Sequence, residues 1–96
     1  MAARAVRAFS IAYQIADDLE DIEADARTAV GAAGNILVVL ETATDCDRAT
    51  AQIEAVHRAR NNLAEALAIA AGLPDGTGAI LSDLARHITH KLNGYQ

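Results

Sequence analysis

Three aspartates in the first third of the chain have the residue type and the spacing to bind a metal ion. Asp17 and Asp21 stand four residues apart, so on a helix their carboxylates project from one face, one turn apart, with Asp18 beside them. Carboxylate oxygens without a nearby histidine or cysteine suit a hard cation such as Mg²⁺, which usually keeps water ligands and takes one or two carboxylates plus phosphate oxygens. The spacing therefore predicts a Mg²⁺ site that a phosphorylated ligand would complete.

The charge around these aspartates supports that prediction. Residues 17–25 hold six acids and no base. Like charges four residues apart repel by roughly 0.2–0.5 kcal/mol per pair, and the C-terminal half of a helix disfavours anions further. Both terms favour a bound cation. The alternative is a solvated helix face that binds nothing, and the residues alone leave both interpretations open.

Composition limits the class of protein that positions these acids. The chain has 96 residues, is 52% hydrophobic with only 3% aromatic residues, and is rich in the helix formers alanine, leucine, glutamate and arginine. We therefore expect an all-α protein of one domain. The net charge is −5, but outside residues 17–25 seven acids face eight bases, so the acidity is local, and no basic patch indicates nucleic-acid binding.

The same composition bears on the cellular setting. The single cysteine, Cys46, excludes an internal disulfide framework and is typical of a reducing compartment. No apolar run reaches transmembrane length and the N-terminus lacks a signal-peptide pattern. We expect a soluble cytoplasmic protein that is not an integral membrane protein.

Four helices are expected, at residues 2–27, at 35–43, between the "TDCD" and "GLP" segments, and at 76–92. The "GAAG" segment at 31–34 is expected to break the first helix from the second. Asp45 and Asp47 are N-cap candidates for the third helix, which should end with Gly72 in the left-handed conformation and with Pro74 preventing continuation.

Apolar spacing predicts which side of each helix is buried. The first helix is apolar on two faces, one with Ile11, Ile15, Leu19 and Ile22, the other with Val6, Phe9, Tyr13 and Ala16. In the third and fourth helices the expected stripes are Ile53, Val56, Leu63, Leu67 and Ala70, and Leu81, Leu84, Ile88 and Leu92. Because a helix apolar on two faces belongs inside a larger bundle, residues 1–96 are expected to be a single all-α domain or a C-terminal fragment of a larger helical bundle.

The segment "FSIAYQIADDLED", residues 9–21, resembles the second aspartate-rich motif of the trans-polyprenyl diphosphate synthases. In that motif an aromatic residue and a glutamine precede Asp-Asp-x-x-Asp, which matches Tyr13 with Gln14 and then Asp17, Asp18 and Asp21. More weakly, "ALAIAAGLPDGTGAILSDLARHI" is similar to the closing segment of the same family.

The resemblance implies a part of an isoprenoid-synthase-type fold and an activity of the farnesyl or geranylgeranyl type. In that family, Mg²⁺ ions held by two facing aspartate-rich motifs bind the diphosphate of an allylic substrate, which then reacts with isopentenyl diphosphate. Carried over, Asp17 and Asp21 would bind Mg²⁺, with Asp18 acting directly or through a neighbour. Gln14, with Tyr13, would contact the substrate. No catalytic residue is assigned.

The chain also departs from the family pattern. A first aspartate-rich motif is missing, and Asn35 stands where a diphosphate-binding lysine is expected after glycine. We expect part of a prenyltransferase that is inactive alone and is either a homo-oligomer or the remainder of a longer chain. The alternatives are a non-catalytic helical subunit of the same fold and a self-associating bundle whose acids are only solvated.

Overall fold

The computed structural model describes residues 2–95, without the side chains of Ala2 and Asp75. These residues form an all-α bundle without strands, which confirms the predicted fold class. The five helices are α1 (Ala2–Asp25), α2 (Ala29–Gly34), α3 (Ile36–Thr44), α4 (Arg48–Ala70) and α5 (Asp75–Asn93).

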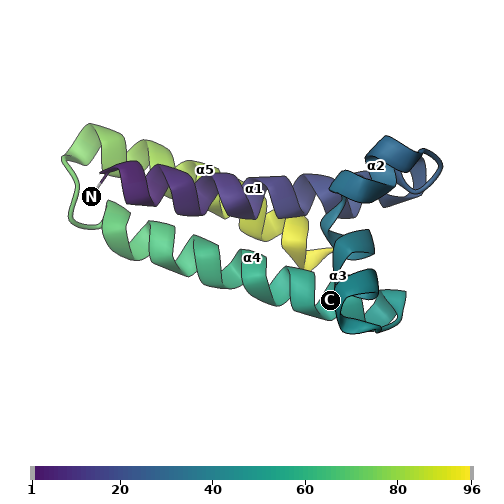
Figure 1. The fold of residues 1–96 in the computed structure, drawn as a ribbon. Coiled ribbons are helices and arrows are strands. Elements are labelled where there is room, and N and C mark those ends of the chain that lie inside the picture. The colour runs from purple at the N-terminus through teal and green to yellow at the C-terminus, as the bar shows by residue number, and fades with distance from the viewer. Residues whose placement is uncertain (1, 96) are drawn as a thin grey trace.

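Three long helices make the body of the bundle. α1, α4 and α5 lie side by side along its 43 Å length, with α4 antiparallel to the other two (Figure 1). The short helices α2 and α3 gather at one end, where the C-terminal turn of α1 projects (Figure 1). The acidic residues 17–25 therefore lie at the end of the bundle that carries α2 and α3.

Small side chains make up most of the buried residues of α1 and α4, which pack against each other. The buried alanines are Ala5, Ala8, Ala12 and Ala16 on α1, and Ala51, Ala55, Ala59, Ala66 and Ala70 on α4. Alanine lets two helix axes approach closely, since interaxial distance depends on the side chains between them. Larger buried residues fill the core towards α3 and α5, among them Ile15, Leu19, Leu37, Leu40, Leu63, Ile88 and Leu92.

This alanine contact corrects part of the predicted burial. Ile53 was expected on the buried stripe of its helix but is 72% exposed, and Leu67, Leu84 and Ile11 are exposed as well. The other members of the predicted α4 and α5 stripes, namely Val56, Leu63, Ala70, Leu81, Ile88 and Leu92, are buried. The stripes were placed by the largest apolar residues, whereas on α4 alanines such as Ala51, Ala55 and Ala59 are completely buried.

The helix boundaries also differ from the prediction at specific residues. "GAAG" is not a break: it is helical in α2, whose first turn is capped by the hydroxyl of Thr28, which accepts a hydrogen bond from the Gly31 N–H. The chain instead leaves the helical conformation at residues 26–28 and at Asn35. Asp47 is the N-cap of α4, as predicted, because its carboxylate accepts from the Thr50 N–H.

Two further capping predictions are wrong. Asp45 caps the C-terminus of α3, where it adopts the left-handed conformation with φ 51°. Gly72 is not left-handed, since no glycine in residues 2–95 has a positive φ, and the right-handed residue Ala71 is the C-cap of α4. Pro74 directly precedes α5 as its N-cap residue.

Candidate functional site: the acidic face of α1

The residues of the aspartate-rich motif all lie on α1, but they do not share one environment. Tyr13, Gln14 and Asp21 are exposed and Asp17 is half-buried, whereas Asp18 is only 7% exposed. Gln14 lines a pocket together with Arg58 of α4, so the exposed members of the motif do not all have the same surroundings. The motif is thus divided between an outward side and an edge that faces α3.

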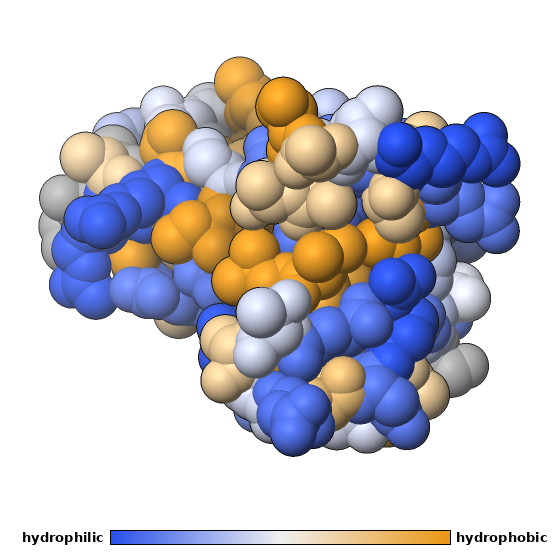
Figure 2. All heavy atoms as spheres, turned by 45° about the vertical axis from the view of Figure 1, so that its right-hand side comes forward, coloured by the Kyte–Doolittle hydropathy of each residue, from blue (hydrophilic) through white to orange (hydrophobic). Residues whose placement is uncertain are grey.

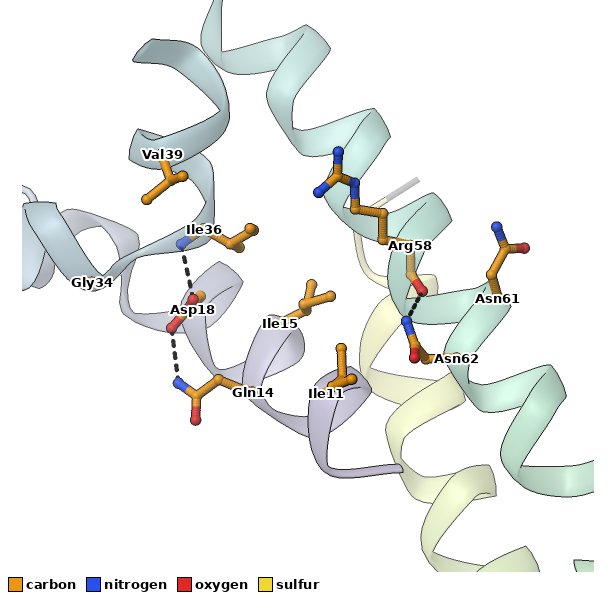
Figure 3. A pocket seen from close by; sticks show the side chains of 10 residues that line it. All are labelled: Ile11, Gln14, Ile15, Asp18, Gly34, Ile36, Val39, Arg58, Asn61 and Asn62. Atoms are coloured by element: carbon orange, nitrogen blue, oxygen red, sulfur yellow. Dashed lines mark hydrogen bonds between the residues drawn. The ribbon is translucent and has the colours of Figure 1, made fainter. Parts of the chain in front are cut away.

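Asp18 is bound on both of its carboxylate oxygens. The Ile36 backbone N–H donates to Asp18 Oδ2 over 2.9 Å, and Gln14 Nε2 donates to Asp18 Oδ1 over 3.2 Å (Figure 3). Ile36 is the first residue of α3, and the N–H groups of a first helical turn have no partner within their own helix. Asp18 therefore joins the middle of α1 to the start of α3.

Asn35 completes this junction. Its side chain is completely buried, its Nδ2 donates to the Asp18 carbonyl (2.8 Å) and to Asp25 Oδ2 (3.0 Å), and its Oδ1 accepts from the Leu37 N–H (2.9 Å). Asn35 is the N-cap of α3. Asn35, which stands where the family pattern has a diphosphate-binding lysine, is thus a buried residue that joins α1 to α3 by hydrogen bonds.

A third acid, Glu20, is paired with a base. Lys91 Nζ of α5 lies 3.2 Å from Glu20 Oε1. The hydrogen bond to Glu20 raises the pKa of Lys91, and the charges of Glu20, Tyr13 and Asp17 act in the same direction. Lys91 therefore places a cation at the edge of the acidic face, and the sequence pattern did not identify this residue.

Asp17 and Asp21 are left without such partners. Within residues 2–95, neither carboxylate takes part in a side-chain hydrogen bond or an ion pair. The charge of Asp17 raises the pKa of Asp21, with smaller contributions from burial, Asp25, Glu20 and Asp18. The two carboxylates therefore repel each other on an outward-facing turn of α1.

A pocket of ≈ 570 Å³ lies beside this face, between α1, α3 and α4 (Figure 3). We call it the α1–α3–α4 pocket. Its apolar walls are Ile11, Ile15, Ile36 and Val39, and its polar lining comes from Gln14, Asp18, Arg58, Asn61 and Asn62. Arg58 is half exposed and its Nε is 2.9 Å from Glu54 Oε1. The pocket thus combines an apolar surface with an exposed cation and polar amides.

Apolar side chains are exposed elsewhere as well. On the face that Figure 2 shows, hydrophobic side chains form a patch bordered by hydrophilic ones. The large apolar residues with substantial exposure are Val6, Ile11, Tyr13, Val30, Val39, Ile53, Leu67, Ile80 and Leu84. Two of them, Val6 and Tyr13, belong to the second apolar face predicted for α1, of which Ala16 is buried and Phe9 packs against the core.

The motif fits a Mg²⁺ ion only in part. Asp17 and Asp21 supply two hard oxygen donors one turn apart, and the repulsion between them would be relieved by a cation. Asp18 already uses both oxygens within the protein. In the described part of the chain, no three histidine, cysteine or acidic side chains are arranged to hold a metal ion. A bound Mg²⁺ would thus take two carboxylates here and fill its shell with water or phosphate oxygens.

Compared with known protein families, curated proteins and solved structures, the chain matches none. None of the helices in residues 2–95 is long and apolar enough to cross a membrane.

Sequence reasoning missed the contributions of Lys91 and Arg58 to this site and did not predict the N-cap role of Asn35. Asn35 had a usable signal, because an asparagine directly before an apolar helical segment is a typical N-cap. Lys91 and Arg58 come from α5 and α4, and nothing in their local sequence relates them to residues 13–21.

Proposed function

We propose that this chain is part of a polyprenyl diphosphate synthase-like protein, of the farnesyl or geranylgeranyl type, with an isoprenoid-synthase-type helical bundle. It contributes one Mg²⁺–diphosphate half-site for prenyl transfer. The observation that carries the proposal is the pair Asp17 and Asp21, at the first and last aspartates of the motif, for which residues 2–95 supply no ion-pair partner. Of the other acids in residues 17–25, Asp18, Glu20 and Asp25 have partners, and Glu23 is exposed on the other side of α1.

In this proposal each residue has a definite task. Asp17 and Asp21 hold the ion from one turn of α1, and Gln14 and Tyr13, exposed one turn earlier, contact the substrate. When bound, Mg²⁺ neutralises the diphosphate and supports its departure as a leaving group. The substrates are an allylic diphosphate and isopentenyl diphosphate. The α1–α3–α4 pocket beside Gln14 offers an apolar wall next to these polar groups.

The proposal extends to the assembly. A homo-oligomer or the remainder of a longer chain would supply the second half-site and cover the exposed apolar residues of α1. A cytoplasmic location, expected from the single cysteine, is also part of the proposal.

Diphosphate binding tests the half-site directly. Inorganic pyrophosphate is titrated into the chain by calorimetry, with Mg²⁺ and with NaCl of matched ionic strength. We expect heat of binding only with Mg²⁺, and we expect Asp17→Asn to weaken it by about tenfold or more, since one of two carboxylate ligands is lost.

Glu23→Gln is the matched control for that titration. It removes the same charge from an exposed residue of the same helix, and helical periodicity places Glu23 on the opposite side from Asp21. Equal binding in the two salts, or equal losses in the two variants, would refute the half-site and leave the solvated-face interpretation, in which Mg²⁺ only screens charge.

One observation favours a second candidate, the non-catalytic helical subunit. Asn35 is completely buried and its side chain is engaged, so it cannot take the part of a diphosphate-binding lysine. Incubation with an allylic diphosphate, isopentenyl diphosphate and Mg²⁺ examines this point. We expect no product from this chain alone. Turnover well above background would refute both the non-catalytic subunit and the hypothesis that the chain holds only one half-site.

A further inference from the structure

We infer that Asp18 is a positioning residue that fixes α3 and Gln14 on α1, and that it is not a metal ligand. The inference rests on three facts: the side chain is 7% exposed, one oxygen accepts from the Ile36 N–H, and the other accepts from the Gln14 amide. It does not depend on the proposed function, because these bonds exist whether or not an ion binds Asp17 and Asp21.

The bond to Ile36 holds the start of α3. The first turn of a helix presents N–H groups that its own backbone cannot satisfy. Asn35 Oδ1 accepts the Leu37 N–H, and Asp18 Oδ2 accepts the Ile36 N–H. The two side chains therefore divide the N-terminal turn of α3 between them, and an anion at that terminus is favoured by the helix dipole.

The bond to Gln14 sets the direction of that amide. An ionised carboxylate can only accept hydrogen bonds, so the Gln14 side chain must present its NH₂ group to Asp18. Its carbonyl oxygen is consequently turned away from Asp18, as Figure 3 shows. The hydrogen bond to Asp18 therefore leaves the Gln14 carbonyl oxygen, an acceptor, free to bind a ligand in the pocket.

Both bonds determine the shape of the α1–α3–α4 pocket. Gln14 lines the pocket on the α1 side, and Ile36 and Val39 line it on the α3 side. The Asp18 carboxylate lies between these walls and is bonded to both (Figure 3). An ion that took Asp18 as a ligand would have to compete with two hydrogen bonds that order the pocket.

Three substitutions separate positioning from ligation. Asp18→Ala removes both acceptors. Asp18→Asn keeps an Oδ1 that can accept from the Ile36 N–H, but its NH₂ would then force the Gln14 amide to turn over. Asp17→Asn makes the same charge change one residue earlier, where no such bond is present.

Amide hydrogen exchange and the Gln14 side-chain NH₂ signals in the NMR spectrum of the chain are the first readouts. We expect Asp18→Ala to lower the protection of the Ile36 amide by about tenfold or more, because a charge-assisted hydrogen bond is lost. Asp18→Asn should keep much of that protection and shift the Gln14 NH₂ signals, and Asp17→Asn should change neither. Unchanged Ile36 protection in Asp18→Ala would overturn the inference.

Should Asp18→Ala not fold, Asp18→Asn decides alone. Shifted Gln14 NH₂ signals with a protected Ile36 amide support the positioning role, and wild-type Gln14 signals overturn it.

The response to Mg²⁺ and pyrophosphate is the second readout. We expect Asp18→Asn to keep the Mg²⁺ dependence of the calorimetric response, whereas Asp17→Asn loses it. An equal loss in both variants would identify Asp18 as a ligand and overturn the inference. If the wild type itself gives no response, the half-site fails, and the exchange data still decide the role of Asp18.

Discussion

Asn35→Ala should be among the most damaging single substitutions in this chain. The side chain is completely buried and makes three hydrogen bonds of 2.8–3.0 Å, one of them to the carboxylate of Asp25. A net hydrogen bond contributes about 0.5–1.5 kcal/mol, bonds to charged groups contribute more, and loss of an N-cap alone costs about 1 kcal/mol. Their sum is about 3 kcal/mol of unfolding free energy.

Thermal melts followed by circular dichroism measure this loss. In a domain of this size each kcal/mol moves Tm by about 4–8 °C, so we expect Asn35→Ala to lower Tm by more than about 10 °C. The control is Asn93→Ala, where an exposed Oδ1 accepts only from Arg60 and the expected change is within about 0.5 kcal/mol. A fall of less than about 3 °C for Asn35→Ala would refute the conclusion that the hydrogen bonds of Asn35 hold α1 and α3 together.

Three further predictions concern charge and exposed surface. Since the charge of Asp17, burial and the charges of other nearby acids raise the pKa of Asp21, ionised Asp21 is unfavourable in the folded state. Asp21→Asn should thus raise Tm near pH 7, and this gain should vanish as the wild type takes up a proton through the raised pKa; a gain that persists near pH 3 would contradict it. The hydrogen bond from Thr50 lowers the pKa of Asp47, so its contribution to stability is present above the pKa of the unfolded chain and is lost as pH falls through the folded value. Asp47→Ala should accordingly lower Tm by a few degrees near pH 7 and by much less near pH 2, in melts at both pH values. Because large apolar residues such as Val30, Ile53 and Ile80 are exposed, the isolated chain should self-associate or bind a hydrophobic dye. A monodisperse monomer with no dye binding in sedimentation and fluorescence experiments would contradict this.

Local sequence signals predicted the long helices because those signals act within a few residues. An alanine-rich segment without proline predicts α1, the Asp47 side chain predicts the start of α4, and Pro74 precedes α5. The prediction of the buried side of α4 was partly wrong because it gave large apolar residues more weight than alanines. A stripe of Ile53 and Leu67 looked more hydrophobic than Ala55 and the other α4 alanines, but close approach of α1 and α4 favours the small side chains.

The candidate site was predictable only as far as one helix reaches. Spacing on α1 predicted only that Asp17 and Asp21 share a face with Asp18 beside them, whereas in the structure Asp21 is exposed, Asp17 half-buried and Asp18 buried. It could not reveal that Asp18, rotated by about 100° from Asp17, faces the start of α3. The contacts of Asp18 with Ile36, and of Lys91 with Glu20, join residues 18 and 71 positions apart, and no periodic pattern encodes such pairs.

The structure also explains why one helix tolerates six acids in nine residues. Asp18 accepts from the start of α3, Asp25 accepts from Asn35, and Glu20 pairs with Lys91, so three of the six carboxylates have a partner. Glu23 is exposed to solvent on the far side of α1. Asp17 and Asp21 lie one turn apart, and the charge of Asp17 is the largest cause of the raised pKa of Asp21, ahead of burial, Asp25, Glu20 and Asp18. A bound cation has to account for two carboxylates and not for six, and two is the number that Mg²⁺ commonly takes from a protein when phosphate oxygens and water supply the rest.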